Sequence, residues 1–133
     1  MNWTDQYIGI PFLCDGRTRS GLDCGGLAML AYREQLGIAL PDYLGTLTDL
    51  SEVGLKRASA NISAELSRWV PVSIAQPFDI ISFRKSAIES CHVGIACSRT
   101  EMLHIIYGIN ACVEEFTGLK WGRKISGIYR YAA

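Results

Sequence analysis

Cys24 and the two histidines of the chain, His92 and His104, are the residues whose types and positions could support nucleophilic catalysis. A thiol becomes a strong nucleophile when it ionises, and a helix start favours the thiolate because unpaired N–H groups and the helix dipole stabilise negative charge. Cys24 follows Asp23 at the beginning of a run of helix-forming residues. Its backbone N–H could also serve as an oxyanion donor. The competing interpretation is that Cys24 is a small buried residue at a helix start.

A nucleophilic thiol needs a base within hydrogen-bond reach, and the base needs a polar partner that fixes its tautomer. His92 opens the β-like run "HVGIACS", and His104 lies in the next run, "EMLHIIYGI". If the hairpin loop between these runs has an odd length, the two histidines lie on the same face of the sheet as cross-strand neighbours. With an even loop they lie on opposite faces.

Zinc binding is the rival use of the same residue types. The candidate ligands besides the histidines are the five cysteines, Cys14, Cys24, Cys91, Cys97 and Cys112. No CxxC or HxxxH pair provides the usual two-ligand chelate, so we expect no metal and no other cofactor. Cys91 adjoins His92 in a strand and should therefore point to the opposite face. Cys97 and Cys112 are expected in or near the core, and Cys14, in a loop, is assigned no role.

A helix from about Asp23 to Leu36 must position Cys24. Asp23 is a suitable N-cap and Gly37 is suited to end the helix. The spacing predicts a buried stripe of Leu27, Leu30, Ala31 and Leu36. In the region 46–69 the pattern predicts one or two short helices, with Asp49 and Glu52 as a capping box.

Five short segments rich in β-branched and aromatic residues must position the histidines. They cover residues 79–84, 92–98, 101–109, 111–116 and 122–131. Because these segments follow the predicted helices, we expect an α+β fold in which N-terminal helices pack on an antiparallel sheet of about five strands. The length of 133 residues predicts a single domain, 1–133.

Composition excludes several classes of function. Hydrophobic residues make up 49% and charged residues 20%, as in ordinary globular proteins. Thirteen basic residues balance thirteen acidic ones without a basic cluster, so we expect no nucleic-acid binding. No apolar run approaches the roughly 20 residues that span a bilayer, and residues 1–12 lack the pattern of a secretory signal. We therefore expect synthesis in the cytoplasm, no membrane insertion and reduced cysteines.

Taken together, these segments resemble the NlpC family of cell-wall cysteine peptidases, which are papain-like in fold, and particularly the branch found with phage tails and prophages. The stretch from about 46 to 70 matches least. The segments that carry the resemblance, in family order, are "YIGIPF", "GRTRSGLDCGGLAMLAYREQLGIALPDY", "PFDIISFR", "CHVGIACSRTEMLHIIYG" and "WGRKISGIYRY".

The resemblance implies a cysteine–histidine–histidine site. In it Cys24 is the nucleophile, His92 the general base and later the general acid, and His104 the residue that orients His92. It further implies cleavage of an amide bond in peptidoglycan stem peptides, typically between D-glutamate and the following diamino acid.

Three further residues acquire substrate-binding roles by the same resemblance. Asp23 would contact a free amine of the stem peptide in addition to its N-cap role. Tyr7 would contact substrate or the oxyanion, with packing under the helix as its alternative. Gly25 stands where many relatives carry a larger residue and would widen the pocket. Independently of the resemblance, Gly25 and Gly26 lack side chains and would let a substrate backbone approach closely.

The chain lacks the secretory signal and the wall-binding repeats of many secreted relatives, so the expected setting is a phage tail or a tail-like particle. There the domain would open the cell wall as part of a virion, or after lysis or injection, with phage tail proteins as partners. Two alternatives stay open. One is an injected antibacterial amidase, and the other is a tail-assembly component that keeps the fold without the activity.

Overall fold

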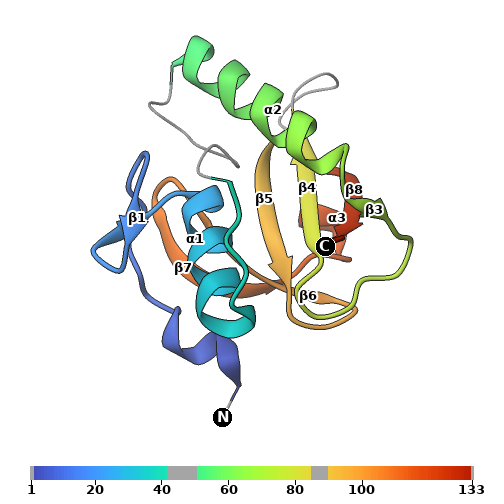
Figure 1. The fold of residues 1–133 in the computed structure, drawn as a ribbon, viewed down its shortest axis with the longest axis horizontal. Helices are drawn as coiled ribbons and strands as arrows, with labels where there is room; N and C mark the ends of the chain where they lie inside the picture. The colour runs from blue at the N-terminus through green and yellow to red at the C-terminus, as the bar shows by residue number, and fades with distance from the viewer. Residues whose placement is uncertain (1, 42–50, 85–89, 133) are drawn as a thin grey trace.

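The computed structural model describes residues 2–41, 51–84 and 90–132, with only the backbone of residues 90 and 91 (Figure 1). Helical and extended segments alternate in the N-terminal half, and strands dominate the C-terminal half. In chain order the elements are η1 (Trp3–Gln6), β1 (Arg17–Thr18), β2 (Gly21–Leu22), α1 (Cys24–Ala31), η2 (Tyr32–Leu36), α2 (Glu52–Leu66), β3 (Val70–Pro71), β4 (Ile80–Arg84), β5 (Ser90–Ala96), β6 (Glu101–Ile106), β7 (Ile109–Glu115), α3 (Leu119–Gly122) and β8 (Ile125–Arg130).

The main sheet has six antiparallel strands in the order β3-β8-β4-β5-β6-β7, and β1 pairs with β2 in a separate two-stranded sheet. The five predicted strands correspond to β4 through β8, which confirms the α+β fold. Two details differ from a simple meander. The last strand, β8, returns to pair with β4, and the short β3 forms the sheet edge, where Pro71 is tolerated.

The sheet separates two hydrophobic clusters. Alternation along β5 sends Val93 and Ile95 to the face that packs against α1 and α2, as Figure 1 shows for the two helices. Ala96, of opposite parity, packs on the other face with Phe83 and with Trp121 of α3. His92 shares its parity with Ala96, so the strand that fills the main core also presents an imidazole to the smaller cluster.

Helix α1 begins as predicted. The side chain of Asp23 accepts a hydrogen bond from the backbone N–H of Gly26 at 2.7 Å, and Gly37, with φ of 68°, ends the helical segment. The buried stripe is confirmed for Leu27, Leu30 and Ala31, but Leu36 is 42% exposed. The physical reason is that residues 32–36 form a π-helix, whose wider turns change the face on which successive residues fall.

In the described part of the middle region, from residue 51 onward, there is one helix, α2, with Ser51 as its N-cap. The hydroxyl of Ser51 accepts a hydrogen bond from the backbone N–H of Gly54 at 3.1 Å. This helix therefore starts at Glu52. The predicted capping box would instead have made Glu52 the third helical residue. The predicted partner, Asp49, lies outside the described residues.

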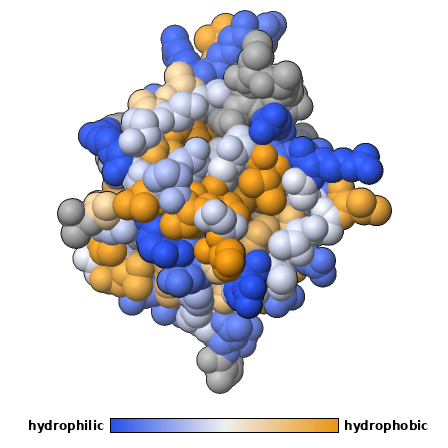
Figure 2. All heavy atoms as spheres, turned by 90° about the vertical axis from the view of Figure 1, so that its right-hand side faces the viewer, coloured by the Kyte–Doolittle hydropathy of each residue, from blue (hydrophilic) through white to orange (hydrophobic). Residues whose placement is uncertain are grey.

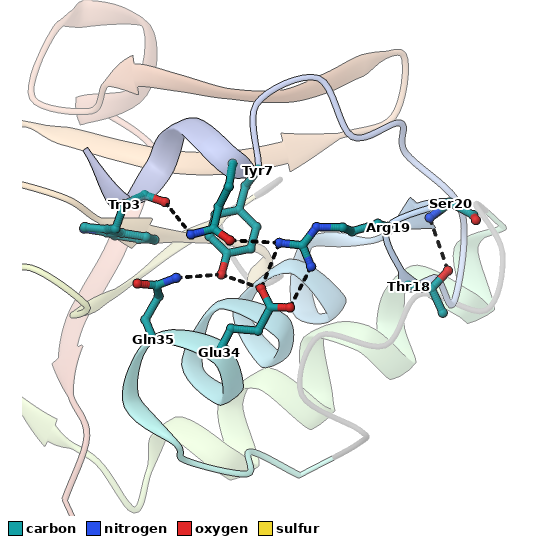
Figure 3. Close-up of polar contacts among 8 residues, drawn as sticks. Trp3, Tyr7, Thr18, Arg19, Ser20, Glu34 and Gln35 are labelled. Atoms are coloured by element: carbon teal, nitrogen blue, oxygen red, sulfur yellow. Dashed lines mark hydrogen bonds and ion pairs between the residues drawn. The ribbon is translucent and has the colours of Figure 1, made fainter. Parts of the chain in front are cut away.

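A polar cluster ties the N-terminal segment to η2 (Figure 3). The hydroxyl of the fully buried Tyr7 donates to Glu34 Oε1 at 2.8 Å and accepts from Gln35 Nε2 at 3.2 Å. Arg19 Nη1 donates to Glu34 Oε2 at 2.6 Å, and Arg19 Nη2 donates to Gln6 Oε1 at 3.0 Å. The cluster thus joins η1, the β1–β2 hairpin and the helical end.

Replacing Glu34 by glutamine is expected to lower the free energy of unfolding at pH 7 by about 1 kcal/mol, because a partly exposed charged hydrogen bond is lost. The hydrogen bond from Arg19 lowers the pKa of Glu34. A depressed carboxyl pKa stabilises the fold above the unfolded value and loses that effect as the pH falls through the folded value. Urea unfolding should therefore show a difference between the two proteins that disappears at acidic pH. Glu52→Gln, in an exposed pair with Lys56, is the control with little effect; an equal loss in both variants would contradict a special role for the cluster.

Candidate active site

The two histidines lie in direct contact. Nε2 of His92 is 3.0 Å from Nδ1 of His104. Strands β5 and β6 pair with Ile95 opposite Leu103, so residues of even number on both strands share a face. The expectation of a same-face arrangement is confirmed, and the two residues are diagonal neighbours across the strand pair.

A carboxylate extends this pair. Nε2 of His104 is 2.6 Å from Oε2 of Glu114 on β7, and Lys120 Nζ donates to Glu114 Oε1 at 3.1 Å. Sequence reasoning missed Glu114. Its signal was the short connection between β6 and β7, which places residues 104, 112 and 114 on one face once the register is known. The site is therefore a chain of four polar side chains from His92 to Lys120.

Trp121 covers the histidine pair. Its ring centroid lies 5.5 Å from that of His92 and 5.1 Å from that of His104. On the same indole, the ammonium groups of Lys120 and Lys124 lie 5.6 and 5.3 Å from the ring centroid. Trp121 is 6% exposed, and its Nε1 has no hydrogen-bond partner among the residues that the structure describes. The indole thus contacts both imidazoles and also lies close to two ammonium groups.

These surroundings keep both imidazoles neutral. Burial, with smaller effects of His104 and Lys124, lowers the pKa of His92 to about 3. Burial also lowers the pKa of His104, although the hydrogen bond to Glu114 opposes the shift. Burial acts to raise the pKa of Glu114, but hydrogen bonds from Lys120 and His104 outweigh it and lower the value. At neutral pH, Glu114 is therefore an anion beside two uncharged rings.

The tautomers follow from these charges. A carboxylate only accepts hydrogen bonds, so Nε2 of neutral His104 carries the proton and its Nδ1 is an acceptor. Nε2 of His92 must then donate to that Nδ1. This leaves Nδ1 of His92 with a lone pair. His92 is half-buried. Of the residues in this hydrogen-bonded series, it is the one whose Nδ1 can accept a proton.

Cys24 is the first residue of α1 and is 6% exposed. Helix α1 packs against β5 and β6, the two strands that carry the histidines. Cys24 belongs to the cluster on the helix side of the sheet, whereas the imidazole of His92 contacts Phe83 and Trp121. The structure thus joins the histidines directly and relates Cys24 to them through helix packing.

Asp23 has a structural role that confirms its prediction as N-cap. Besides the bond to the Gly26 N–H, its Oδ1 accepts from Arg17 Nη1 at 2.8 Å, and its Oδ2 accepts from the Asp15 N–H at 3.1 Å. The side chain is fully buried. The chain's own donors therefore surround this carboxylate, and a substrate amine would have to compete with Arg17, a partner that sequence reasoning missed.

Gly26, the second glycine after Cys24, differs from the expectation, and Gly25 precedes it in the helix. Both are buried. A Cβ on Gly26 would overlap the backbone carbonyl oxygen of Gly16 and would approach Arg17 Nη1 to 3.0 Å. The space beside Gly26 is therefore filled by the chain's own loop and is not open to a substrate backbone. The role of Gly25 as a residue that shapes the pocket stays a prediction.

Gly26→Ala is expected to destabilise the protein by about 3 kcal/mol. The added methyl group would overlap the backbone carbonyl oxygen of Gly16, which cannot move away by a rotamer change as a side chain can. Thermal or urea unfolding measures the loss. The matched control is Gly118→Ala, where the new Cβ meets only the flexible side chain of Glu115, at 3.5 Å. Comparable stability of the two variants would contradict the tight contact.

Tyr7 lies near the other end of the helical segment from Cys24. Its hydroxyl partner, Glu34, follows Cys24 by ten residues, which corresponds to about 15 Å along a helix. Tyr7 is 0% exposed, and its hydroxyl is occupied by Glu34 and Gln35. The structure therefore shows the packing alternative for Tyr7 and does not bring it to Cys24.

The remaining cysteines are half-buried where they are described. Cys14, Cys97 and Cys112 have intermediate exposure, and the side chain of Cys91 lies outside the described residues. Burial raises the pKa of Cys97 and of Cys112. Cys112 is paired across the strands with His104. One group among the described residues could hold a metal ion, namely His104, Cys112 and Glu114.

A separate hollow lies on the face that carries β3, β8 and α3. Figure 2 shows hydrophobic side chains gathered in the middle of this face with hydrophilic ones around them. The cavity has a volume of about 670 Å³. Its lining contains none of the predicted site residues; it consists of Ser73, Ile74, Ala75, Arg99, Thr100, Phe116, Thr117, Gly122, Ile125 and Ile128. The four polar side chains from His92 to Lys120 are therefore not part of this cavity.

Comparison with known proteins decides the family. A model of the NlpC/P60 family matches residues 9–130, a range that includes Cys24, both histidines and Glu114. The chain belongs to the NlpC/P60 family. Members of this family are cell-wall peptidases and hydrolases.

Two curated relatives illustrate the activities within NlpC/P60. The chain is 28% identical over 131 residues to the Gamma-DL-glutamyl hydrolase of Bacillus subtilis, with 96% of this chain and 27% of that protein covered. It is 24% identical over 123 residues to the Murein DD-endopeptidase MepS/Murein LD-carboxypeptidase of Escherichia coli K12, with 90% of this chain and 56% of that protein covered. The chain thus spans only part of each relative.

Solved NlpC/P60 structures share the fold. A family protein from Bacillus cereus superposes with a TM-score of 0.73 at 19% identity, over 96% of this chain and 37% of that one. The NlpC/p60 domain of the peptidoglycan hydrolase SagA gives a TM-score of 0.66 at 21% identity, over 96% of this chain and 92% of that one. The papain-like fold is confirmed. None of the described helices has the length and apolar character needed to cross a membrane.

Proposed function

We propose that residues 1–133 form one NlpC-type domain that hydrolyses peptidoglycan stem peptides, at the amide bond between D-glutamate and the following diamino acid. The observation that carries the proposal is the series of hydrogen bonds from His92 through His104 to Glu114, which places the lone pair of His92 on Nδ1, where it can act as a base. Membership of NlpC/P60 adds the substrate class, since the names of the relatives include a glutamyl hydrolase and a murein endopeptidase.

In the proposed reaction, Nδ1 of His92 takes the proton of the Cys24 thiol, and the thiolate attacks the amide carbonyl. The backbone N–H of Cys24 donates to the developing oxyanion. The C–N bond breaks as His92 gives its proton to the leaving amine, which leaves a thioester on Cys24. Water then attacks the thioester with His92 again as base, and the products are a carboxylate and the regenerated thiol.

The remaining residues of the proposed site position Cys24 and His92. Glu114 holds the proton on Nε2 of His104, and His104 holds the proton of His92 on Nε2. Asp23 fixes the start of α1, and with it the position of Cys24. We assign Gly25 to the wall of the substrate pocket. Contact of Asp23 with the stem-peptide amine requires its bond to Arg17 to open.

We propose a phage or prophage tail as the biological setting, with delivery to the cell wall in a particle, after lysis or by injection, and with tail proteins as partners. The support is the resemblance of the N-terminal and strand segments to that branch of the family. The genes beside this one test the setting: structural tail genes would support it, whereas an adjacent immunity gene would favour an injected amidase.

Digestion of purified muropeptides followed by mass spectrometry tests the activity. Stem peptides with diaminopimelate and with lysine as the third residue should be compared, each with and without a free N-terminal amine. We expect one cleavage, after D-glutamate, in at least one of these substrates. Lack of cleavage in all of them would reject the endopeptidase and favour a tail-assembly component.

A further inference from the structure

Cys112 and Glu114 are spaced as a chelating pair on a β-strand, a spacing that the CxxC and HxxxH patterns do not include. The two residues are separated by one position on β7, so their side chains lie on the same face of the strand. Cys112 is paired directly with His104 on β6. One ligand atom from each of the three residues lies within 4.8 Å of the other two. Two hydrogen-bonded strands therefore bring three potential ligands together.

The donor set indicates which cation would bind. A thiolate, an imidazole nitrogen and a carboxylate oxygen are ligands of Zn²⁺, whereas Mg²⁺ and Ca²⁺ prefer oxygen alone. Three protein ligands and one water complete the usual coordination of four. The charges of the Cys112 thiolate and the Glu114 carboxylate neutralise those of a divalent cation. Lys120 opposes binding through its charge, but it contacts Oε1 of Glu114, whereas His104 contacts Oε2.

Exposure makes the site reachable. Cys112 and Glu114 are half-buried, whereas His104 is 1% exposed. A cation would thus approach over β7 and meet the thiol and the carboxylate before the imidazole. Nε2 of His104 already points to Oε2 of Glu114, at 2.6 Å, so the ring nitrogen that would bind the metal faces this side.

We propose that His104, Cys112 and Glu114 bind Zn²⁺, and that the bound metal switches off His92 as a base by reversing the tautomers of the histidine pair. Metal on Nε2 of His104 displaces its proton, so Nδ1 must carry one. Nδ1 of His104 then donates to Nε2 of His92, and the proton of neutral His92 moves to Nδ1. The lone pair that would accept the Cys24 proton is lost.

The protons balance across this change. His104 loses the Nε2 proton to solvent and receives the Nε2 proton of His92, and His92 takes one proton from solvent on Nδ1. Cys112 releases its thiol proton to solvent as the sulfur–zinc bond forms. One proton is released in total for each metal bound. Metal binding itself does not depend on the proposed function; only its inhibitory consequence rests on it.

Cobalt binding tests the site independently of activity. Co²⁺ replaces Zn²⁺ in such sites, and a thiolate ligand gives a charge-transfer absorption band. The Cys24→Ala protein, which lacks the nucleophilic thiol, should show this band at one equivalent of Co²⁺. Adding Cys112→Ser should remove the band, whereas adding Cys97→Ser, which changes another half-buried thiol, should retain it. A protein without the band, or a band that survives Cys112→Ser, would overturn the site.

Zinc inhibition tests the consequence. Each protein's cleavage rate with Zn²⁺ is divided by its own rate with a chelator, so differences in basal rate cancel. We expect at least tenfold inhibition of the parent and of Cys97→Ser, and at least a tenfold higher inhibitory concentration for Cys112→Ser. Equal inhibition of Cys112→Ser would point to zinc on Cys24 and overturn the switch. If the parent cleaves no substrate, the proposed function fails while the cobalt result still decides the metal site.

Discussion

Replacing Cys24 by alanine is expected to lower the rate of stem-peptide cleavage by about 10⁴-fold or more, because removing a nucleophile eliminates the covalent pathway and leaves only binding effects. The rate is measured on muropeptides by the appearance of the new amine. Cys24 is 6% exposed, so the variant loses one buried sulfur and should still fold, with a stability cost of about 1 kcal/mol.

Cys97→Ala is the matched control, since it also removes a thiol, but one that lies beyond the end of β5. This variant should keep parental activity. Cleavage by Cys24→Ala at a rate near that of the parent would show that the thiol of Cys24 is not the nucleophile.

Glu114→Gln is expected to lower kcat by about 10²-fold or more, as the wrong tautomer does in other triads. The orientation of the new amide explains the size of the effect. Lys120 only donates hydrogen bonds, so the amide oxygen turns to Lys120 and the NH₂ group faces Nε2 of His104. His104 must then accept at Nε2 and carry its proton on Nδ1. His92 receives that hydrogen bond and loses the lone pair on Nδ1.

The double variant Glu114→Gln with Lys120→Met tests this orientation. Without the lysine, the amide can rotate and present its oxygen to His104, so activity should recover by at least about tenfold over Glu114→Gln. Lys120→Met alone should stay within about tenfold of the parent, because Glu114 remains an acceptor. A double variant no more active than Glu114→Gln would contradict the tautomer argument.

Local patterns predicted the parts of the site that depend on short-range rules. The N-cap role of Asp23 and the end of the helical segment at Gly37 follow from capping preferences, and both are present. The contact of His92 with His104 follows from side-chain alternation once the hairpin loop is known. Residues that act within one turn or one hairpin were thus accessible from sequence.

The remaining features depend on an irregular strand register or on contacts between distant segments. Glu114 joins His104 through the β6–β7 register, which contains an irregularity between His104 and Ile106 that alternation alone does not show. The overlap at Gly26 involves Gly16, which a separate hairpin brings against the helix. The short β6–β7 connection gives a signal for Glu114 only once the register is known, and the position of Gly16 is set by packing.

The covalent intermediate on Cys24 is the central claim, and partitioning with hydroxylamine tests it most directly. Hydroxylamine attacks a thioester in competition with water, so part of the D-glutamyl product should carry a hydroxamate in place of the carboxylate. The account predicts that mass spectrometry will show a hydroxamate fraction that rises with hydroxylamine concentration, while the leaving amine is released no more slowly. The Cys24→Ala variant should form neither product. Carboxylate as the sole product of the parent at every hydroxylamine concentration would contradict an acyl-enzyme on Cys24.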